Sequence, residues 1–586
     1  MKILIVTTEI GLDGGGLSLS CTKLADVLSR KHTVEIADST AQPILTASGG
    51  ALAHLRHSIG MEYKLKMEVE KYKDYDAVIG FGGNFNGYYS SLLAHKINAK
   101  YVLSFRGSDI NLSKWSAETD WYSHKAIDKA DKIVVLSNEM KNNVLHVSPS
   151  AKNKVTIIPN VFEGKQTKIS FPNLPSSITI GCAASYLNEK KGIANLLCVV
   201  SEFKKMSPLP IKLILVGKID DDLKLEYKQI INDLKLKDNV LLVNKMSRSD
   251  LAQTMKNWDF YVQGSVCEGC SNSVMEAFQN GCAFISTKTG FIAEALSPKY
   301  PYFFFDSFNP TSMSLSLLKL INLKDKELLY SKAHKDLVRC CNKYIIENKW
   351  LEIFDTVPVQ RPIPDGIENV IAIGLHDIQG ELHDSITTPV AVFEKFVDQI
   401  YNSGYGLCSM RDYIAKNAEE RKSWIVCTFD DGYKDLNKYA LPILCKYGFT
   451  ASVFICTGLI GKDNKWNNKD AVPRRHLNMD ELHNLHRNGW EIASHGVHHY
   501  NLLKLTAVEI DSELSMSHDF LVKEWGEAIS YAYPYGAYNA FIMNCVGRYY
   551  KYAFSVTQGG DSLVADSLQI RRYSIAEIYQ MLNSGQ

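Results

Sequence analysis

The chain has 586 residues, of which 46% are hydrophobic and 22% are charged, an ordinary globular composition that suits two to four domains of roughly 100–200 residues. Its 65 basic and 64 acidic residues give a formal net charge of +1, so no global electrostatic attraction favours nucleic acid as a partner. We find no run of about 18 apolar residues, so the sequence predicts no membrane-spanning helix.

The opening MKILIVTTEI lacks the basic start, long apolar stretch and small-residue cleavage site of a secretory signal. It predicts a first strand instead, and we expect a cytoplasmic protein. The 13 cysteines are scattered, many of them in apolar runs, which is typical of small buried side chains in a reducing compartment. Cys267 and Cys270 have the spacing of a redox or zinc pair, but no second pair accompanies them.

Short β-branched runs alternate with helical periodicity up to about residue 356. The first set of predicted strands covers residues 2–8, 33–39, 76–82, 101–107, 131–137 and 155–160. The second set covers residues 177–185, 211–218, 240–245, 259–265 and 282–289. Such alternation is typical of a parallel sheet wrapped by helices, so we predict two doubly wound, Rossmann-like domains over residues 1–170 and 171–356.

A proline-rich segment, TVPVQRPIPDG, cannot continue a helix, and we predict a linker over residues 357–368. Strand-like runs then return at residues 370–377, 405–410, 424–431, 450–456, 490–495, 529–536 and 552–557. Helical stretches such as 388–404 separate them. We therefore expect residues 369–586 to form a closed or partly closed α/β barrel, with its chemistry at the carboxyl ends of the strands.

Two features of the first part of the chain point to a phosphate-containing ligand. Gly14, Gly15 and Gly16 follow the first predicted strand, where backbone N–H groups can approach a phosphate at a helix N-terminus. Their spacing matches neither common nucleotide-binding fingerprint, and three glycines are as consistent with a plain turn. Farther along, Glu268 follows a predicted strand, and Glu276 is expected in the first turn of the next helix.

The stretch EGCSNSVMEAFQNG, with Glu268 and Glu276 eight positions apart, resembles the retaining glycosyltransferases of the GT-B fold. KVTIIPN, LNEKKG and KLILVGK occur in the order typical of that family. The resemblance implies a nucleotide-sugar donor, expected to be UDP-linked, in the cleft between the two domains. It implies that Glu268 holds the donor sugar near its reacting carbon, and that the donor is bound by Gly15, Gly16, Lys191, Ser273 and Glu276.

The segment FRGSD offers two further candidates from the first domain. Arg106 and Asp109 would contact a sugar or the acceptor, or else form an ion pair at a strand end. Tyr186 stands where many relatives carry an arginine near the phosphates, five residues before Lys191. Phosphate binding would therefore depend more on Lys191 and on backbone N–H groups.

In the last part of the chain, the strand-like run IVCTF ends in Asp430 and Asp431, followed by Gly432. A strand that breaks at glycine can turn two neighbouring carboxylates toward one pocket. Two like charges so close require a cation or a role as a base. His495 and His499 are spaced to share one face of a turn. With Asp431 they could form a three-ligand zinc centre with an open position.

The motifs TFDDG, SHGVHHYNL and YAYPYG resemble the polysaccharide deacetylases, the NodB-homology carbohydrate esterases, over about residues 369–574. The resemblance implies that Asp430 is the general base, that the backbone N–H of Tyr535 helps to hold the oxyanion, and that a divalent metal, expected to be Zn²⁺, is bound by Asp431, His495 and His499.

The chain departs from this family at two points. Tyr533 replaces the arginine that orients the catalytic aspartate in many relatives, and Arg572 is the candidate to replace it. The late histidine that acts as general acid is not found, which leaves His376 and His498 as candidates.

Together the resemblances imply a bifunctional enzyme of glycan assembly, such as capsule or lipopolysaccharide synthesis. A transferase would add an N-acetylated sugar to a saccharide or lipid-linked glycan, and an esterase would remove an acetyl group. The alternative is an active transferase with a non-catalytic, carbohydrate-binding last domain. The basic and apolar stretch at residues 64–73 would suit peripheral contact with the inner membrane, or an ordinary solvated helix.

Overall fold

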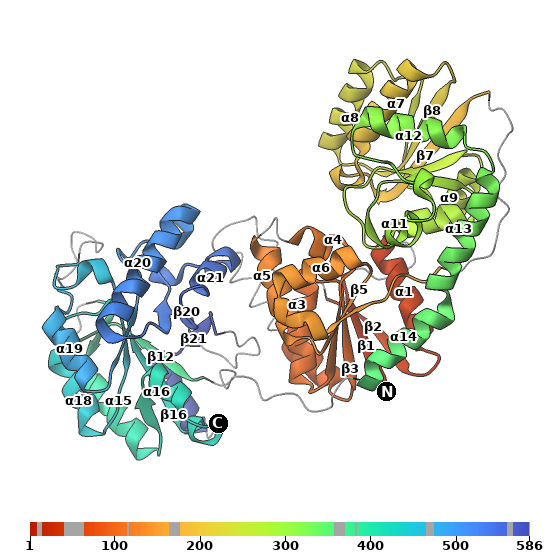
Figure 1. Cartoon of the computed structure of the whole chain (residues 1–586). Helices are drawn as coiled ribbons and strands as arrows, with labels where there is room; N and C mark the ends of the chain where they lie inside the picture. Colours follow the sequence, from red (N-terminus) through yellow and green to blue (C-terminus); the bar gives the residue numbers. More distant parts are fainter. Residues whose placement is uncertain are drawn as a thin grey trace. The chain divides into compact units, whose positions relative to one another are not determined.

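A computed structural model describes residues 1–8, 15–39, 64–113, 117–162, 176–356, 370–380, 384–464, 474–558 and 567–584 (Figure 1). Gly14 and the predicted linker over 357–368 lie outside these ranges. The chain divides into two compact units, one of residues 1–40 with 68–359 and the other of residues 41–67 with 360–586. Across the described ranges, every helix is too short or too polar to span a bilayer.

The first half of the first unit is a parallel sheet with strand order β2-β1-β3-β4-β5-β6. Its strands are β1 (Lys2–Thr7), β2 (Thr33–Asp38), β3 (Ala77–Phe81), β4 (Lys100–Ser104), β5 (Lys132–Val135) and β6 (Val155–Ile157). The helices that follow them are α1 (Gly16–Leu28), α3 (Asn84–Lys96), α4 (Ser108–Asn111), α5 (Ala117–Lys129) and α6 (Asn138–Val147). Residues 3–6 of β1 are all fully buried, because helices cover both faces of a parallel sheet.

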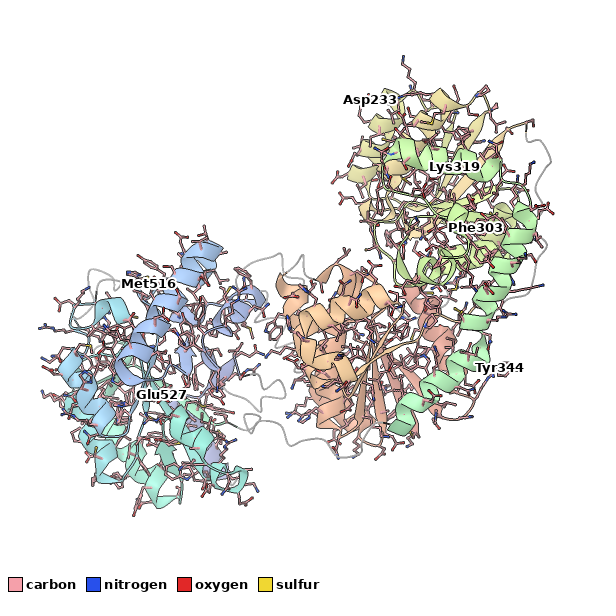
Figure 2. All side chains as sticks on the ribbon, in the orientation of Figure 1. Asp233, Phe303, Lys319, Tyr344, Met516 and Glu527 are labelled. Carbon is pink, nitrogen blue, oxygen red and sulfur yellow. The ribbon has the colours of Figure 1, made fainter. Side chains whose placement is uncertain are left out.

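The second half has its own parallel sheet, with strand order β11-β10-β7-β8-β9. Its strands are β7 (Ile178–Tyr186), β8 (Ile211–Lys218), β9 (Val240–Val243), β10 (Phe260–Gln263) and β11 (Ala283–Ser286). Its helices are α7 (Ile193–Met206), α8 (Asp221–Asp233), α9 (Arg248–Met255), α10 (Asn272–Gln279), α11 (Gly290–Leu296), α12 (Pro310–Ile321) and α13 (Lys326–Cys341). Phe303, labelled in Figure 2, stacks on Tyr330 of α13 in this core, with ring centroids 3.7 Å apart.

Helix α14 (Lys343–Thr356) follows the second half in sequence but packs on the first half. Its Ile346, Trp350, Ile353 and Phe354 are buried in one core with residues of β1, β3 and α1, and Figure 1 shows it beside α1. The exposed Tyr344 lies near its start (Figure 2). The end of the predicted second domain, 171–356, therefore contributes to the core of the first.

The second unit contains a sheet of eight strands, with order β12-β16-β17-β18-β19-β20-β21 and β15 paired to β16. The strands are β12 (Ala372–Leu375), β15 (Gly406–Cys408), β16 (Trp424–Phe429), β17 (Ser452–Ile455), β18 (Glu491–Ser494), β19 (Ser530–Ala532), β20 (Tyr552–Gln558) and β21 (Ile570–Arg572). A parallel bridge between Ile373 and Tyr573 links the end of the last strand to the first. The sheet is therefore a nearly closed barrel.

Helices surround this barrel, and one small ribbon flanks it. The helices are α15 (Val390–Asn402), α16 (Met410–Ala415), α17 (Ala418–Arg421), α18 (Leu441–Lys446), α19 (Met479–Arg487), α20 (Ala507–Trp525), α21 (Ala540–Val546) and α22 (Ile575–Ser584). The ribbon pairs β13 (Asp377–Gln379) with β14 (Thr387–Pro389). One buried apolar cluster takes a residue from each of the eight strands, including Val426, Phe454 and Phe554. This cluster fills the barrel interior, as expected for a barrel of this size.

Candidate functional site

The first unit contains a cavity of about 510 Å³ at the carboxyl ends of strands from both of its sheets. Six of the residues predicted from the sequence line it: Gly16, Arg106, Asp109, Lys191, Glu268 and Ser273. Two others, Gly15 and Glu276, are not among the described residues of its lining. Gly15 instead precedes α1 as its N-cap residue.

Lys191 and Glu268 form an ion pair in this cavity, with Nζ and Oε1 2.7 Å apart. Burial alone would raise the pKa of Glu268, but the ammonium groups of Lys191 and Lys190 lower it below its ordinary value. Gly192 follows with φ 65°, and a Cβ atom there would lie 2.2 Å from the carbonyl oxygen of Gly264. Only glycine fits where the backbone of residue 192 approaches that of Gly264 so closely. This contact fixes the end of the loop after β7 and so positions the neighbouring Lys191.

Helix α10 presents its N-terminal end to the cavity. The Ser271 hydroxyl accepts a hydrogen bond from the backbone N–H of Val274 and caps the helix, and Asn272 and Ser273 line the cavity. Glu276 lies in the second turn of α10, so its predicted place in the first turn is wrong. Burial raises the pKa of Glu276, with Arg248 3.9 Å away.

The Asp109 carboxylate organises the loop after β4. It accepts hydrogen bonds from the backbone N–H groups of Gly83 at 2.7 Å, Gly107 at 2.7 Å and Arg106 at 2.9 Å. Among the described residues, Asp109 forms no ion pair with the Arg106 guanidinium, which donates to Ser104 and Asn160 instead. The predicted ion pair at the strand end is thus replaced by a structural role for Asp109, whereas contact with a sugar or the acceptor stays a prediction.

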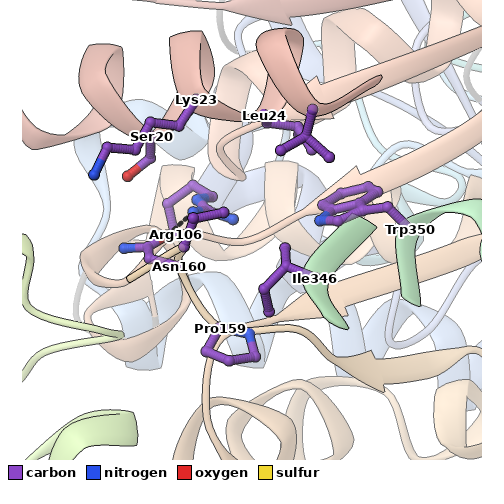
Figure 3. Close-up of a pocket in the computed structure, with 10 residues that line it drawn as sticks. Ser20, Lys23, Leu24, Arg106, Pro159, Asn160, Ile346 and Trp350 are labelled. Carbon is purple, nitrogen blue, oxygen red and sulfur yellow. Dashed lines mark hydrogen bonds between the residues drawn. The ribbon is translucent and has the colours of Figure 1, made fainter. Parts of the chain in front are cut away.

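The Arg106 guanidinium also lies against a second, much smaller pocket of about 20 Å³. Figure 3 shows Arg106 beside Asn160, with Ser20 and Lys23 of α1 on one side and Ile346 and Trp350 of α14 on another. Burial lowers the pKa of Arg106 to about 10, which leaves it charged at neutral pH. The same guanidinium lines the large cavity, where it can meet a polar ligand.

Two asparagines that sequence reasoning missed join the halves beside the cavity. The Asn160 amide donates to the carbonyl of Cys270 at 2.9 Å and to Oδ1 of Asn272 at 3.1 Å. Asn272 in turn donates to the carbonyl of Gly16 at 3.1 Å and to Ser20 at 2.9 Å. Asn160 follows a strand and Asn272 begins a helix. Asparagine is so common at such positions that the sequence alone does not mark either residue as functional.

In the second unit, Asp430 and Asp431 directly follow β16, as predicted. The chain takes left-handed conformations at Asp431 (φ 67°) and Gly432 (φ 65°), and this turn directs both carboxylates to one site. Oδ1 of Asp431 lies 3.5 Å from Nε2 of His495 and 3.3 Å from Nε2 of His499. The three ligand atoms lie within 4.8 Å of one another.

These residues fit a divalent metal. Oδ1 of Asp431 is buried and has no hydrogen-bond partner among the described residues, which is costly unless a cation binds there. Nδ1 of His495 lies 2.8 Å from the carbonyl oxygen of Ala532; a proton on Nδ1 leaves the lone pair of Nε2 free. Burial lowers the pKa of His499 to about 3, so that imidazole is neutral at pH 7. The two histidines converge through left-handed backbone at Gly496 and His499.

Asp430 is held by Arg572, which reaches it from β21. Its Nη1 donates to Oδ1 at 2.6 Å and its Nη2 to Oδ2 at 2.8 Å, and both side chains are at most 4% exposed. Burial alone would raise the pKa of Asp430, but the Arg572 guanidinium holds it well below its ordinary value. Arg572 thus stands where it can orient the aspartate. Tyr533 is buried and donates to the carbonyl of Leu568.

The two candidates for general acid differ in position. Nε2 of His376, at the end of β12, lies 4.0 Å from Oδ2 of Asp430, and its side chain is about one third exposed. His498 is bonded to Glu513 of α20 through Nδ1 at 2.5 Å. Tyr535 has φ 59°, and its ring centroid lies 4.6 Å from that of His499. Geometry therefore favours His376 over His498.

The family model for glycosyl transferases group 1 matches residues 168–336, and the one for polysaccharide deacetylase matches residues 417–550. The chain joins a group 1 glycosyltransferase region to a polysaccharide deacetylase region. The deacetylase match contains all three candidate metal ligands and Asp430, and the transferase match contains Lys191, Glu268 and Glu276. Two Rossmann-like halves followed by a barrel-like deacetylase, the predicted α/β fold class, are confirmed.

Individual relatives agree with this assignment. The glycosyltransferase MJ1059 of Methanocaldococcus jannaschii, itself uncharacterized, is 31% identical over 231 residues, 35% of this chain and 54% of that protein. Poly-beta-1,6-N-acetyl-D-glucosamine N-deacetylase of Staphylococcus aureus is 28% identical over 176 residues, 28% of this chain and 59% of that protein. The chain therefore spans little more than half the length of either relative.

A solved structure shares the fold of the transferase part. The crystal structure of Anabaena Alr3699/HepE in complex with UDP and glucose has a TM-score of 0.50 and 16% identity, and the match covers 61% of this chain and 100% of that one.

Proposed function

We propose that the chain is a bifunctional enzyme of glycan assembly, with a retaining glycosyltransferase in its first unit and a metal-dependent N-deacetylase in its second. The observation that carries the second activity is the pairing of an ionised, arginine-bound Asp430 with three convergent ligand atoms on Asp431, His495 and His499. A paired acid and base beside an open metal position is the arrangement that hydrolysis of an acetamide requires.

In the deacetylase site, a divalent metal bound by the three ligands, proposed to be Zn²⁺, would supply Lewis-acid chemistry to the water and the carbonyl. The Arg572 guanidinium lowers the pKa of Asp430, so this carboxyl group is ionised at neutral pH. It can therefore accept the proton of the attacking water. The backbone N–H of Tyr535 donates to the developing oxyanion. His376, 4.0 Å from Asp430, donates a proton to the departing amine.

In the transferase site, we propose that the cavity of the first unit binds a nucleotide sugar, with UDP as the nucleotide. The N-terminal end of α10 and the charge of Lys191 would stabilise the departing diphosphate. Glu268 would then exchange its bond to Lys191 for one to the donor sugar, and Gly16 and Ser273 would line the donor. Gly15 and Glu276 remain proposed donor contacts at the edge of this site, while Arg106 and Asp109 face the acceptor.

The acceptor we propose is a saccharide or a lipid-linked glycan of the capsule or lipopolysaccharide type, modified in the cytoplasm, with peripheral contact at the inner membrane. Lys66 is an exposed cation of the 64–73 stretch that could meet anionic lipid. Lys71 and Lys73 are engaged within the protein: Lys71 Nζ bonds Glu35 at 3.2 Å and Tyr72 at 2.6 Å, and Lys73 Nζ lies 3.3 Å from Glu70.

The deacetylase proposal is tested by acetate release from UDP-GlcNAc and from short GlcNAc-containing glycans in the presence of zinc. We expect release by the wild type, none by Asp430→Asn, and unchanged release by Asp519→Asn, which alters an exposed carboxylate of the same unit. If the wild type binds zinc and releases no acetate from any of these sugars, the second unit is a carbohydrate-binding module and the transferase is the only enzyme.

The transferase proposal has a separate test, namely binding of UDP followed by calorimetry. We expect Lys191→Met to weaken UDP binding by about tenfold or more, because a buried charge-assisted bond to a phosphate contributes roughly 1.5–3 kcal/mol. Lys218→Met removes a nearby lysine outside the described cavity lining and serves as the control. Equal affinity in all three proteins would contradict the assigned donor site.

A further inference from the structure

Helix α20 presents two polar, buried side chains to the loop that carries two of the three candidate metal ligands. Glu513 lies on this helix and is only 6% exposed, and Ser517, one turn later, is fully buried. Met516 of the same helix is 56% exposed and is labelled in Figure 2. The face of α20 that holds Glu513 and Ser517 therefore packs inward.

Both oxygens of the Glu513 carboxylate form hydrogen bonds to the loop between His495 and His499. Its Oε2 accepts the backbone N–H of Val497 at 2.9 Å and that of His498 at 3.0 Å. Its Oε1 lies 2.5 Å from Nδ1 of His498. One buried side chain thus binds three donors of the two central loop residues, and each of these bonds is charge-assisted.

A second contact from the same helix holds the start of the loop. Ser494 donates to Ser517 at 3.0 Å and accepts the backbone N–H of Gly496 at 3.1 Å. Gly496 has φ 84°, and a Cβ atom there would lie 3.2 Å from Oε2 of Glu513. The loop therefore lies directly against the carboxylate.

The loop needs such support because its shape is unusual. Gly496 and His499 both have left-handed backbone, and His499 carries a side chain that disfavours it. Residues kept in such conformations persist only where their surroundings over-determine them. With no regular helix between the two histidines, their convergence on Asp431 depends on bonds from outside the loop.

We propose that Glu513 is a positioning residue that holds the 495–499 loop in the shape required to bind the metal. It touches neither the metal ligand atoms nor Asp430 and acts through Val497 and His498. The proposal rests on the metal-dependent function proposed above. Partners of this kind around a metal site typically change metal affinity by 10–100-fold when they are altered.

The test measures zinc affinity of the full chain by competition with a chromophoric chelator, for wild type, Glu513→Gln and Asp519→Asn. Gln is the same size as Glu, but it keeps only one acceptor oxygen for the three donors. We expect zinc affinity to fall about 10–100-fold in Glu513→Gln and to stay unchanged in Asp519→Asn, which removes an exposed carboxylate from the same helix. Wild-type affinity in Glu513→Gln would overturn the proposal.

Hydrogen exchange without metal gives an independent readout. We expect faster exchange in Glu513→Gln at the amides of Val497 and His498, while the amides of the barrel strands exchange as in wild type. If the wild type binds no zinc, the proposed deacetylase function fails. Hydrogen exchange then decides by itself whether Glu513 holds the loop, and unchanged exchange in Glu513→Gln would refute that role. Should Glu513→Gln fail to fold, the shorter Glu513→Asp is measured in the same way, because its carboxylate cannot reach all three donors, and wild-type exchange at Val497 and His498 in that variant would also contradict the proposal.

Discussion

Replacement of Arg572 by methionine tests the physical basis of the deacetylase site. The substitution keeps the apolar length of the side chain and removes both hydrogen bonds to Asp430, 2.6 and 2.8 Å long. Asp430 is then a carboxylate that is only 2% exposed and has lost its cation. We expect two effects, one on stability and one on the pH dependence of acetate release.

The magnitude follows from the burial of the pair. Breaking a buried ion pair by removing one partner costs about 3–5 kcal/mol, and 1 kcal/mol changes the Tm of domains of this size by roughly 2–4 °C. The melting transition of the second unit should therefore fall by about 6–20 °C at pH 7. Without its cation, the buried carboxyl group of Asp430 takes up a proton. The fall in Tm should therefore lie in the lower part of this range.

The sign of the pH effect follows from the direction of the pKa. In the wild type the pKa of Asp430 lies below its ordinary value, so the stability that its ionised form contributes is present above about pH 4 and is lost only at lower pH. In Arg572→Met, burial without the guanidinium raises that pKa above its ordinary value. The acidic limb of the plot of acetate-release rate against pH should therefore move to higher pH.

The assay is acetate release between pH 4 and 9 with zinc present, together with thermal unfolding of the full chain. Arg571→Met is the matched control, because Arg571 is the neighbouring residue on β21 and its side chain alternates to the other face of the strand. If Arg572→Met and wild type share the same acidic limb, Arg572 does not set the ionisation of Asp430, and the proposed base is wrong.

Three further predictions concern stability. Arg474→Met should destabilise the second unit by about 3–5 kcal/mol in urea unfolding, because Arg474 bonds the fully buried Asp377 at 2.8 Å and Asp384 through both its Nη atoms. Gly192→Ala should lower the Tm of the first unit and weaken UDP binding, since the new Cβ meets the carbonyl of Gly264 at 2.2 Å. Zinc at a concentration of about 100 times its Kd should stabilise the second unit by about 2.7 kcal/mol, and a chelator should abolish this gain.

Control substitutions at comparable positions separate these effects from non-specific destabilisation of the fold. Arg475→Met removes a neighbouring arginine whose side chain, among the described residues, bonds only the carbonyl of Gly461, and it should change the urea midpoint little. Gly526→Ala replaces another left-handed glycine, one with open space around it, and should cost about 1 kcal/mol. A wild-type midpoint for Arg474→Met, or no response to zinc, would contradict the corresponding prediction.

The order of strands and helices could be predicted from local sequence pattern, and so could the candidate site residues. Runs such as IVCTF and KLILVG are apolar because both faces of a parallel sheet are buried, so their positions can be predicted from local pattern alone. The break at Gly432 likewise indicated that Asp430 and Asp431 turn toward one pocket. The order of motifs pointed to the same families that the family models match.

Which of these residues meet depends on the packing of segments that are distant in the sequence. Asp430 and Arg572 are 142 positions apart, and they pair because the order and the closure of the barrel bring β21 beside β12, the strand that pairs with β16. The contact of Glu513 with the histidine loop and the return of α14 to the first half have no local signal either. Local patterns record which side chains are buried, whereas the partner of a buried charge is set by strand order and register between distant segments.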